Sequence, residues 1–136
     1  MEKRKLRAAI GCDEGAVPRK HMGDCSEFCI YDVYEDGTYE LVTRKPNTLP
    51  EEKQHADPAK LQQALKELAD CEVMVSGLLS PNFIRMRDTK PVQPVVVKPG
   101  TLEEAMKLLH ENFDHIYSLV EARRRGERPK EIPIIG

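Results

Sequence analysis

The sequence contains no tryptophan, only 5% aromatic residues and no long hydrophobic run. Its apolar stretches span a few residues, as at 95–97, far short of the roughly 20 needed to cross a bilayer. The 21 lysines and arginines nearly balance the 23 aspartates and glutamates, which gives a formal net charge of −2. A general nucleic-acid binder usually carries an excess of basic residues. We therefore expect neither membrane insertion nor nucleic-acid binding.

The sequence has four cysteines in 136 residues. The N-terminus MEKRKLRAAIG has a basic start but no apolar stretch long enough for a signal peptide. We expect a cytoplasmic, reducing location, where the cysteines would be thiols or metal ligands rather than disulfides. With 40% hydrophobic and 32% charged residues, the chain has the composition of one globular domain. We place this domain at residues 1–125 and a C-terminal tail at 126–136.

Hydrophobic patterning predicts an α/β fold. Alternating or β-branched runs predict strands at 6–11, 28–34, 39–43, 71–76 and 93–97. Apolar stripes at helical spacing and capping signals predict helices at 57–68, 82–87 and 101–124. The first three strands would form a meander, because an Asp-Gly turn joins the second to the third. The order then implies a mixed five-stranded sheet, in which two parallel strands follow the meander and helices flank the sheet.

Chemically versatile side chains gather in the loop that follows the first strand, roughly residues 12–24. Ligands of open α/β sheets tend to bind beyond the carboxyl ends of strands, where this loop lies. Imidazole and thiolate together suit iron, copper, zinc and iron–sulfur species, and a glycine lets a bulky ligand approach the backbone. The candidate cofactor-binding residues here are Cys12, His21, Met22, Gly23 and Cys25. Of these, His21 and Cys25 are the candidate metal ligands.

The four cysteines are not equivalent. Cys29 falls inside a predicted strand and Cys71 opens a buried one, so both are expected to be core residues. Cys12, at the end of the first strand, fits either packing or binding. Cys25 precedes a strand, and the basic residues at 19–20 lie close enough in sequence to favour its thiolate. Cys25 is therefore the expected reactive thiol.

Two other functional classes are open at this point. A metal-dependent hydrolase or nuclease would use the carboxylates of Asp13 and Asp32. A non-metal interaction module would have all four cysteines in the core and would stay colourless and metal-free. No P-loop and no Gly-x-Ser-x-Gly elbow is present in the sequence.

The sequence resembles the dinitrogenase iron–molybdenum cofactor biosynthesis family, which includes small cofactor carriers and nitrogenase accessory proteins. The resemblance covers roughly residues 5–122 and rests on the segments RAAIGCDEG, HMG, EFCIYDVYEDGTYELV, ADCEVMVSG and TLEEAMKLL, in this order. His21 matches the motif histidine of the family and His55 a loop histidine. Met22 stands where the family typically has phenylalanine.

The resemblance implies an RNase H-like fold. It also implies binding of an iron–sulfur or molybdenum–iron–sulfur cofactor or precursor, and its transfer to a protein partner in cofactor assembly. No catalysis is expected of such a carrier. In this reading His55 joins the candidate cofactor-binding residues, and the wider context is nitrogen fixation.

Overall fold

The computed structural model describes residues 3–47, 66, 68 and 70–136. The candidate residue His55 and nearly all of the helix expected at 57–68 lie outside the described residues.

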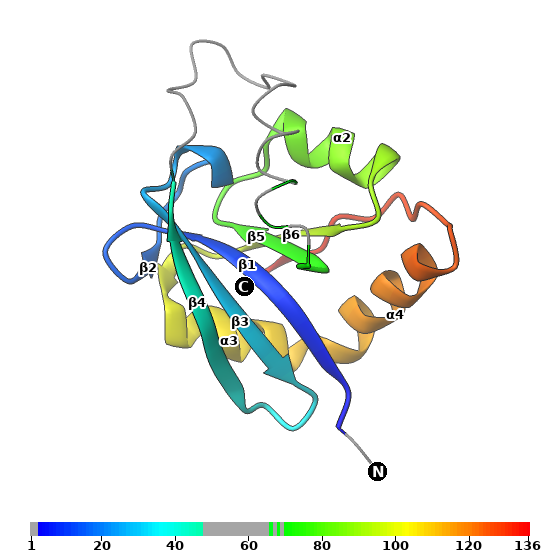
Figure 1. Ribbon diagram of the computed structural model, residues 1–136, viewed down its shortest axis with the longest axis horizontal. Helices are drawn as coiled ribbons and strands as arrows, with labels where there is room; N and C mark the ends of the chain where they lie inside the picture. The colour runs from blue at the N-terminus through cyan, green and yellow to red at the C-terminus, as the bar shows by residue number, and fades with distance from the viewer. Residues whose placement is uncertain (1–2, 48–65, 67, 69) are drawn as a thin grey trace.

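A six-stranded mixed sheet forms the centre of the domain (Figure 1), in the order β4-β3-β1-β5-β6-β8. Its strands are β1 (Lys5–Cys12), β3 (Glu27–Tyr34), β4 (Tyr39–Pro46), β5 (Val73–Ser76), β6 (Gln93–Val97) and β8 (Ile134–Ile135). β3 runs antiparallel to β1 and β4, whereas β1, β5, β6 and β8 are parallel. The mixed α/β sheet is confirmed. The sequence predicted five strands, one too few, because the C-terminal residues add β8.

Two short elements lie near the carboxyl end of β1. β2 (Ala16–Val17) pairs with β7 (Gly100–Thr101) in a separate two-stranded sheet. The 3₁₀ helix η1 (Met22–Asp24) follows, directly before β3. The loop after β1 is thus tied to the segment that enters the next helix.

Two helices begin at side-chain caps. The backbone N–H of Phe83 donates to Ser80 Oγ at 3.1 Å at the start of α2 (Pro81–Thr89). Thr101 and Glu104 form the expected capping box at the start of α3 (Leu102–Glu111). These hydrogen bonds satisfy backbone N–H groups that have no partner inside the helix.

The single long helix expected from residue 101 is interrupted. Asn112 leaves the helical region with ψ of 15°, and its side-chain amide donates to the Leu108 carbonyl at 2.9 Å. A new helix, α4 (Phe113–Arg124), starts directly after it. The asparagine side chain competes with the backbone for helical hydrogen bonds, which favours a break at this position.

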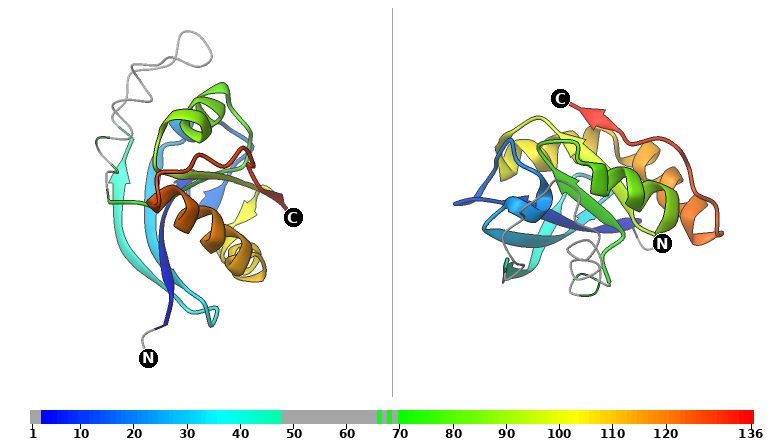
Figure 2. Two further views of the ribbon diagram at one scale, coloured as in Figure 1. Left: turned by 90° about the vertical axis from the view of Figure 1, so that its right-hand side faces the viewer. Right: turned by 90° about the horizontal axis from the view of Figure 1, so that it is seen from above.

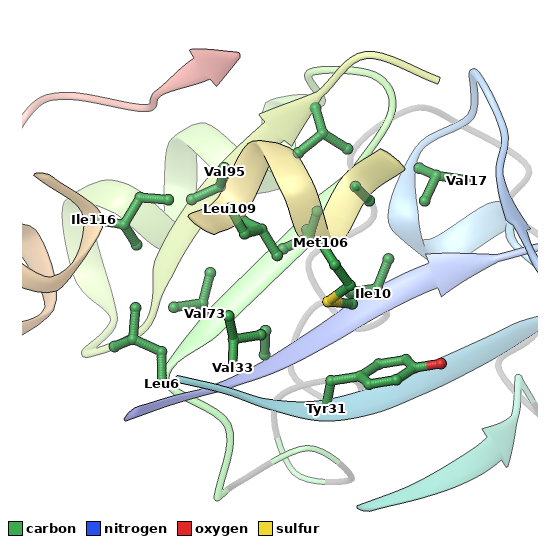
Figure 3. Close-up of a cluster of buried hydrophobic side chains, with 14 of the residues drawn as sticks. Leu6, Ile10, Val17, Tyr31, Val33, Val73, Val95, Met106, Leu109 and Ile116 are labelled. Carbon is green, nitrogen blue, oxygen red and sulfur yellow. The ribbon is translucent and has the colours of Figure 1, made fainter. Parts of the chain in front are cut away.

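Helices cover both faces of the central strands. Figure 2 shows α2 on one side of β5 and β6 and α3 with α4 on the other. On β1, Ala8, Ile10 and Cys12 face the α3–α4 side, and Ala9 faces the α2 side. Figure 3 shows strand residues such as Val73 meeting Leu109 of α3. Burial on both faces explains why these strands read as nearly continuous apolar runs.

β4 is the exception, because it forms an edge of the sheet and is exposed along nearly its whole length. Its register with β3 shifts between Ile30, which pairs with Thr43, and Tyr31, which pairs with Leu41. Val42 is therefore the extra residue of a β-bulge, which bends the strand and increases its twist.

The C-terminal segment is held by a buried arginine. Arg123 in α4 donates to Gln93 Oε1 at 2.7 Å and to the Pro129 carbonyl at 3.2 Å. The same guanidinium donates to the carbonyl oxygens of Arg87 and Lys90, at the end of α2. The division into a domain at 1–125 and a tail at 126–136 stays a prediction, and β8 shows that the end of this tail joins the sheet.

Candidate functional site

The loop between β1 and β3 folds back onto the end of β1. A Cβ atom at Gly11 would lie 2.9 Å from Cys25 Sγ and 3.2 Å from Met22 Cα. Only a residue without a side chain permits this approach. Directly after the neighbouring strand β5, a Cβ at Gly77 would clash with the Pro18 carbonyl. The loop therefore lies at the carboxyl ends of β1 and β5, the edge where ligands of α/β sheets bind.

Asn47, directly after β4, holds the backbone of this loop. Its side-chain Nδ2 donates to the carbonyl oxygens of Gly23 at 2.8 Å and Cys25 at 2.7 Å. Its backbone N–H donates to the Ser26 carbonyl at 2.9 Å. Sequence reasoning missed Asn47, because no local pattern links it to a loop more than 20 residues earlier. The turn at 22–25, directly before β3, is thus fixed by a residue that directly follows β4, at the same open end of the β3–β4 hairpin.

A polar cluster closes the base of the loop. Asp13 accepts hydrogen bonds from Lys20 Nζ at 2.5 Å and from the Ser26 backbone N–H at 2.6 Å. Ser26 Oγ donates in turn to the Cys12 carbonyl at 3.1 Å. The Lys20 ammonium, assisted by Ser26, holds the pKa of the Asp13 carboxyl below its usual value. Asp13 is therefore an ionised structural anchor of the loop.

His21 and Met22, adjacent in sequence, have different surroundings. The His21 side chain is 13% exposed, and its Nδ1 lies 3.9 Å from Asp24 Oδ2. Met22 is only 7% exposed and packs in the core cluster beneath α2, with Ala9 and Phe28. The Met22 thioether thus packs against the sheet, and the partly exposed imidazole lies at the surface of the loop.

Cys25 is buried, contrary to the sequence expectation of an activated thiol. It is 2% exposed, and its Sγ donates to the His21 carbonyl at 3.6 Å. Burial, reinforced by the negative charges of Asp13 and Asp24, raises the pKa of the Cys25 thiol to about 12. Lys20 lowers this pKa, but its effect is smaller than those of burial and Asp13. The sequence expectation of a thiolate at Cys25 was wrong, chiefly because the side chain is buried.

The other cysteines are all buried and unbridged. Cys29 and Cys71 are core residues, as predicted. Cys12 is fully buried on the α3–α4 side of β1, whereas Gly11 turns toward the loop on the α2 side. Of the sequence candidates, the structure therefore brings His21, Met22, Gly23 and Cys25 together in one turn, and it places Cys12 on the opposite face of the sheet.

The two carboxylates of the hydrolase hypothesis are kept apart. Asp32 pairs across the sheet with Arg7, whose guanidinium donates to both carboxylate oxygens at 2.9 and 3.1 Å. Asp13 lies six residues beyond Arg7, which corresponds to roughly 20 Å along a strand. In the described part of the chain, no three His, Cys, Asp or Glu side chains converge as a metal site would require. No helix among these residues is long and apolar enough to span a membrane.

Comparison with known proteins decides the family. The family model described as dinitrogenase iron-molybdenum cofactor matches residues 4–112. The chain belongs to this family. The matched range runs from the start of β1 to Asn112, and it contains the whole turn at 21–25. A search of curated proteins finds no significant match.

Membership in the dinitrogenase iron–molybdenum cofactor family associates the chain with that cofactor. The resemblance stated from the sequence is thereby confirmed. α4, Arg123 and β8 lie beyond the range that the family model matches.

Proposed function

We propose that this protein binds an iron–sulfur or molybdenum–iron–sulfur cluster, or a precursor of one, as cargo and passes it to a partner protein in cofactor assembly, without catalysing a reaction itself. The observation that carries the proposal is the family match over residues 4–112, which includes the site loop. An RNase H-like architecture belongs to the same proposal and is supported by the strand order β4-β3-β1-β5-β6, with β3 antiparallel to its neighbours.

The ligand that we assign first is His21. Its imidazole is partly exposed at the surface of the loop, and a neutral ring nitrogen is a ligand for iron in a mixed sulfur environment. His55, outside the described residues, is proposed as a second imidazole. Arg19 and Lys20 precede His21 in the exposed part of the loop. Arg19 would attract an anionic sulfide cluster, and Lys20 would contribute less, because its ammonium pairs with Asp13.

Cys25 would act only after the turn opens. In the closed loop its thiol is buried and protonated, and a thiol must lose its proton to bind a metal. Loading through Cys25 therefore requires the turn to move away from Gly11. A cluster held by one imidazole and one such thiolate would be released readily, as cargo transfer requires.

The test is anaerobic reconstitution with ferrous iron and sulfide, read by iron content and visible absorbance. The wild-type protein should take up a coloured cluster. His21→Ala should reduce uptake by about tenfold or more and leave the fold intact. His115→Ala is the matched control, because His115 lies in α4 and contacts Glu131.

Equal loading of wild type and His21→Ala would contradict the assignment of His21. A wild-type protein that stays colourless and metal-free would contradict the proposed function and favour the interaction module. Release is read separately, by transfer of iron to a small-molecule chelator.

A further inference from the structure

Basic side chains gather where the C-terminal ends of α2 and α4 meet the segment 125–131. Figure 1 shows both helix ends on the same side of the molecule, with the orange-red C-terminal segment passing from one to the other. Hydrogen bonds fix this arrangement, because Arg87 Nη1 donates to the Lys130 carbonyl at 3.3 Å and Lys130 Nζ donates to Asp88 Oδ1 at 2.9 Å. We call this surface the basic patch, with the cations Arg87, Lys90, Arg125, Arg128 and Lys130 and the carboxylates Asp88 and Glu127.

The cations of the patch are not needed to close the helix ends. The carbonyl oxygens of Arg87 and Lys90 at the end of α2 already accept hydrogen bonds from the buried Arg123. Exposed cations near a helix C-terminus stabilise the helix only weakly. The side chains of Lys130 and Arg125 are 75% and 62% exposed, and ion pairs at such exposed positions contribute little to stability. Stability therefore does not account for this concentration of positive charge.

The carboxylates of the patch do not balance its cations. Asp88 and Glu127 each pair with cations of the patch. The Arg128 guanidinium donates to the Glu127 carbonyl, which carries no formal charge. Burial, and after it the positive charge of Arg128, lowers the pKa of the nearby Arg123 guanidinium to about 10. An anion at this surface would therefore meet a local excess of positive charge.

We propose that the basic patch is a docking surface for an acidic segment of a partner protein. The carboxylates of such a segment would pair with the lysines and arginines, and a guanidinium can donate two parallel hydrogen bonds to one carboxylate. The patch lies at the amino end of β6, next to Gln93, whereas the site loop lies at the carboxyl ends of β1 and β5. A partner bound here would leave the turn at 21–25 open, and the proposal does not depend on cluster binding.

The rest of the surface favours a short acidic segment over a nucleic acid. The whole chain has a net charge of −2 although the patch is positive, so the remainder carries an excess of negative charge. A nucleic acid that extended beyond the patch would be repelled by this remainder. None of the residues that form the patch is aromatic, so the patch offers no platform on which bases could stack. An acidic peptide segment needs neither an extended basic surface nor a stacking platform.

The experiment measures binding of a short fluorescent peptide of alternating glutamate and serine to the metal-free, full-length protein, by fluorescence anisotropy at about 0.15 M salt. Arg128→Gln and Lys130→Gln should each weaken binding by about two- to fivefold, as expected for the loss of one exposed charge pair. Asp88→Asn should strengthen binding, because it removes a carboxylate that competes for the same cations. Lys107→Gln is the matched control and should bind as wild type does, because Lys107 is an exposed lysine of α3 outside the patch.

Two further measurements identify the binding surface and the class of partner. Backbone amide NMR signals should shift on addition of the peptide at residues 87–90 and 125–131, and not at 12–25. DNA of the same net charge as the peptide should bind more weakly than the peptide. Unchanged binding by Arg128→Gln and Lys130→Gln, weaker binding by Asp88→Asn, shifts centred on residues 12–25, or tighter binding of the DNA would each overturn the proposal. Because the protein is metal-free, none of these outcomes depends on the cluster reconstitution.

Discussion

The Cys25 sulfur lies against the backbone of Gly11, so closely that a Cβ atom at Gly11 would be 2.9 Å from it. This contact joins the end of β1 to the turn that carries His21. The position of the turn therefore depends on a strand residue that has no side chain.

Gly11→Ala should destabilise the protein by about 1–3 kcal/mol, the usual cost of forcing an extra methyl group into a packed site. The free energy of unfolding, measured in urea, reads the change. In a Cys25→Ala background the same substitution should cost less, because the closest atom that it meets is gone. Additive effects of the two substitutions would show that they do not contact each other.

Asn47→Ala should loosen the turn and expose Cys25. The variant loses both hydrogen bonds from Asn47 Nδ2, to Gly23 and Cys25, which should cost about 1–3 kcal/mol. The rate at which Cys25 reacts with a thiol reagent should rise, measured by peptide mapping of the labelled site. Asn112→Ala removes a comparable amide in the break between the helices and should leave the Cys25 rate unchanged. An unchanged rate in Asn47→Ala would mean that other contacts hold the turn.

Asp32→Asn should reduce stability at neutral pH by about 2 kcal/mol, because it breaks charged hydrogen bonds to Arg7 at a carboxylate whose side chain is 8% exposed. Arg7 lowers the pKa of Asp32, so this stability is present above the ordinary carboxyl pKa and is lost as the pH falls. The difference in the free energy of unfolding between Asp32→Asn and wild type should therefore become smaller at acid pH. Asp114→Asn, at an exposed carboxylate paired with Arg4, should have little effect. A pH-independent difference would argue against a charge effect at Asp32.

Alkaline pH should destabilise the protein through its buried thiols. Burial raises the pKa of Cys71 to about 12, so the folded state keeps a proton that the unfolded chain loses near its ordinary pKa of 9.0. The stabilisation is complete below this lower value and is lost as pH rises toward the folded pKa. Thermal unfolding midpoints should fall above about pH 9, and fall less steeply in Cys71→Ala. If the unfolding midpoints of wild type and Cys71→Ala fell equally with rising pH, the Cys71 thiol would not be the cause of the alkaline loss of stability.

The C-terminal isoleucines should contribute unequally to stability. Ile132 packs against the α2-side core and Ile135 against the α3–α4 core, whereas Ile134 is 69% exposed. Ile132→Ala and Ile135→Ala should each cost about 1–2 kcal/mol, with Ile134→Ala nearly neutral in the same urea titration. Deletion of residues 132–136 should lower the melting temperature. From sequence alone we expected residues 126–136 to be a tail outside the domain, and an unchanged melting temperature would support that expectation.

The central strands and helix starts could be predicted because their signals are local. The Val95–Val97 run matches β6, and Thr101 with Glu104 marks the start of α3. The break at Asn112 was missed because the apolar stripe continues through it to Phe113 and Ile116, and hydrophobic spacing does not report hydrogen bonds from a side chain to the backbone. β8 was missed because two residues after a proline are too short to show alternation.

The site was predicted less well than the fold. Sequence order placed His21, Met22 and Cys25 in one loop, and the structure agrees. The sequence did not show that Met22 and Cys25 are buried, because their burial depends on contacts with Gly11 in β1 and with Asn47 directly after β4. Ligand-like residue types therefore indicated where the loop lies, but not which side chains reach its surface.

The bulge in β4 has a consequence for behaviour at high concentration. A straight edge strand offers unpaired backbone groups to any neighbouring chain, and Tyr39, Leu41 and Val42 are all exposed on this one. The extra residue Val42 interrupts the regular spacing of the outward hydrogen-bonding groups, and the segment 44–46 ends the strand with two cations and a proline. These are features that natural sheets use against edge-to-edge aggregation. The protein thus carries an apolar sheet edge that is poorly matched to a second copy of itself.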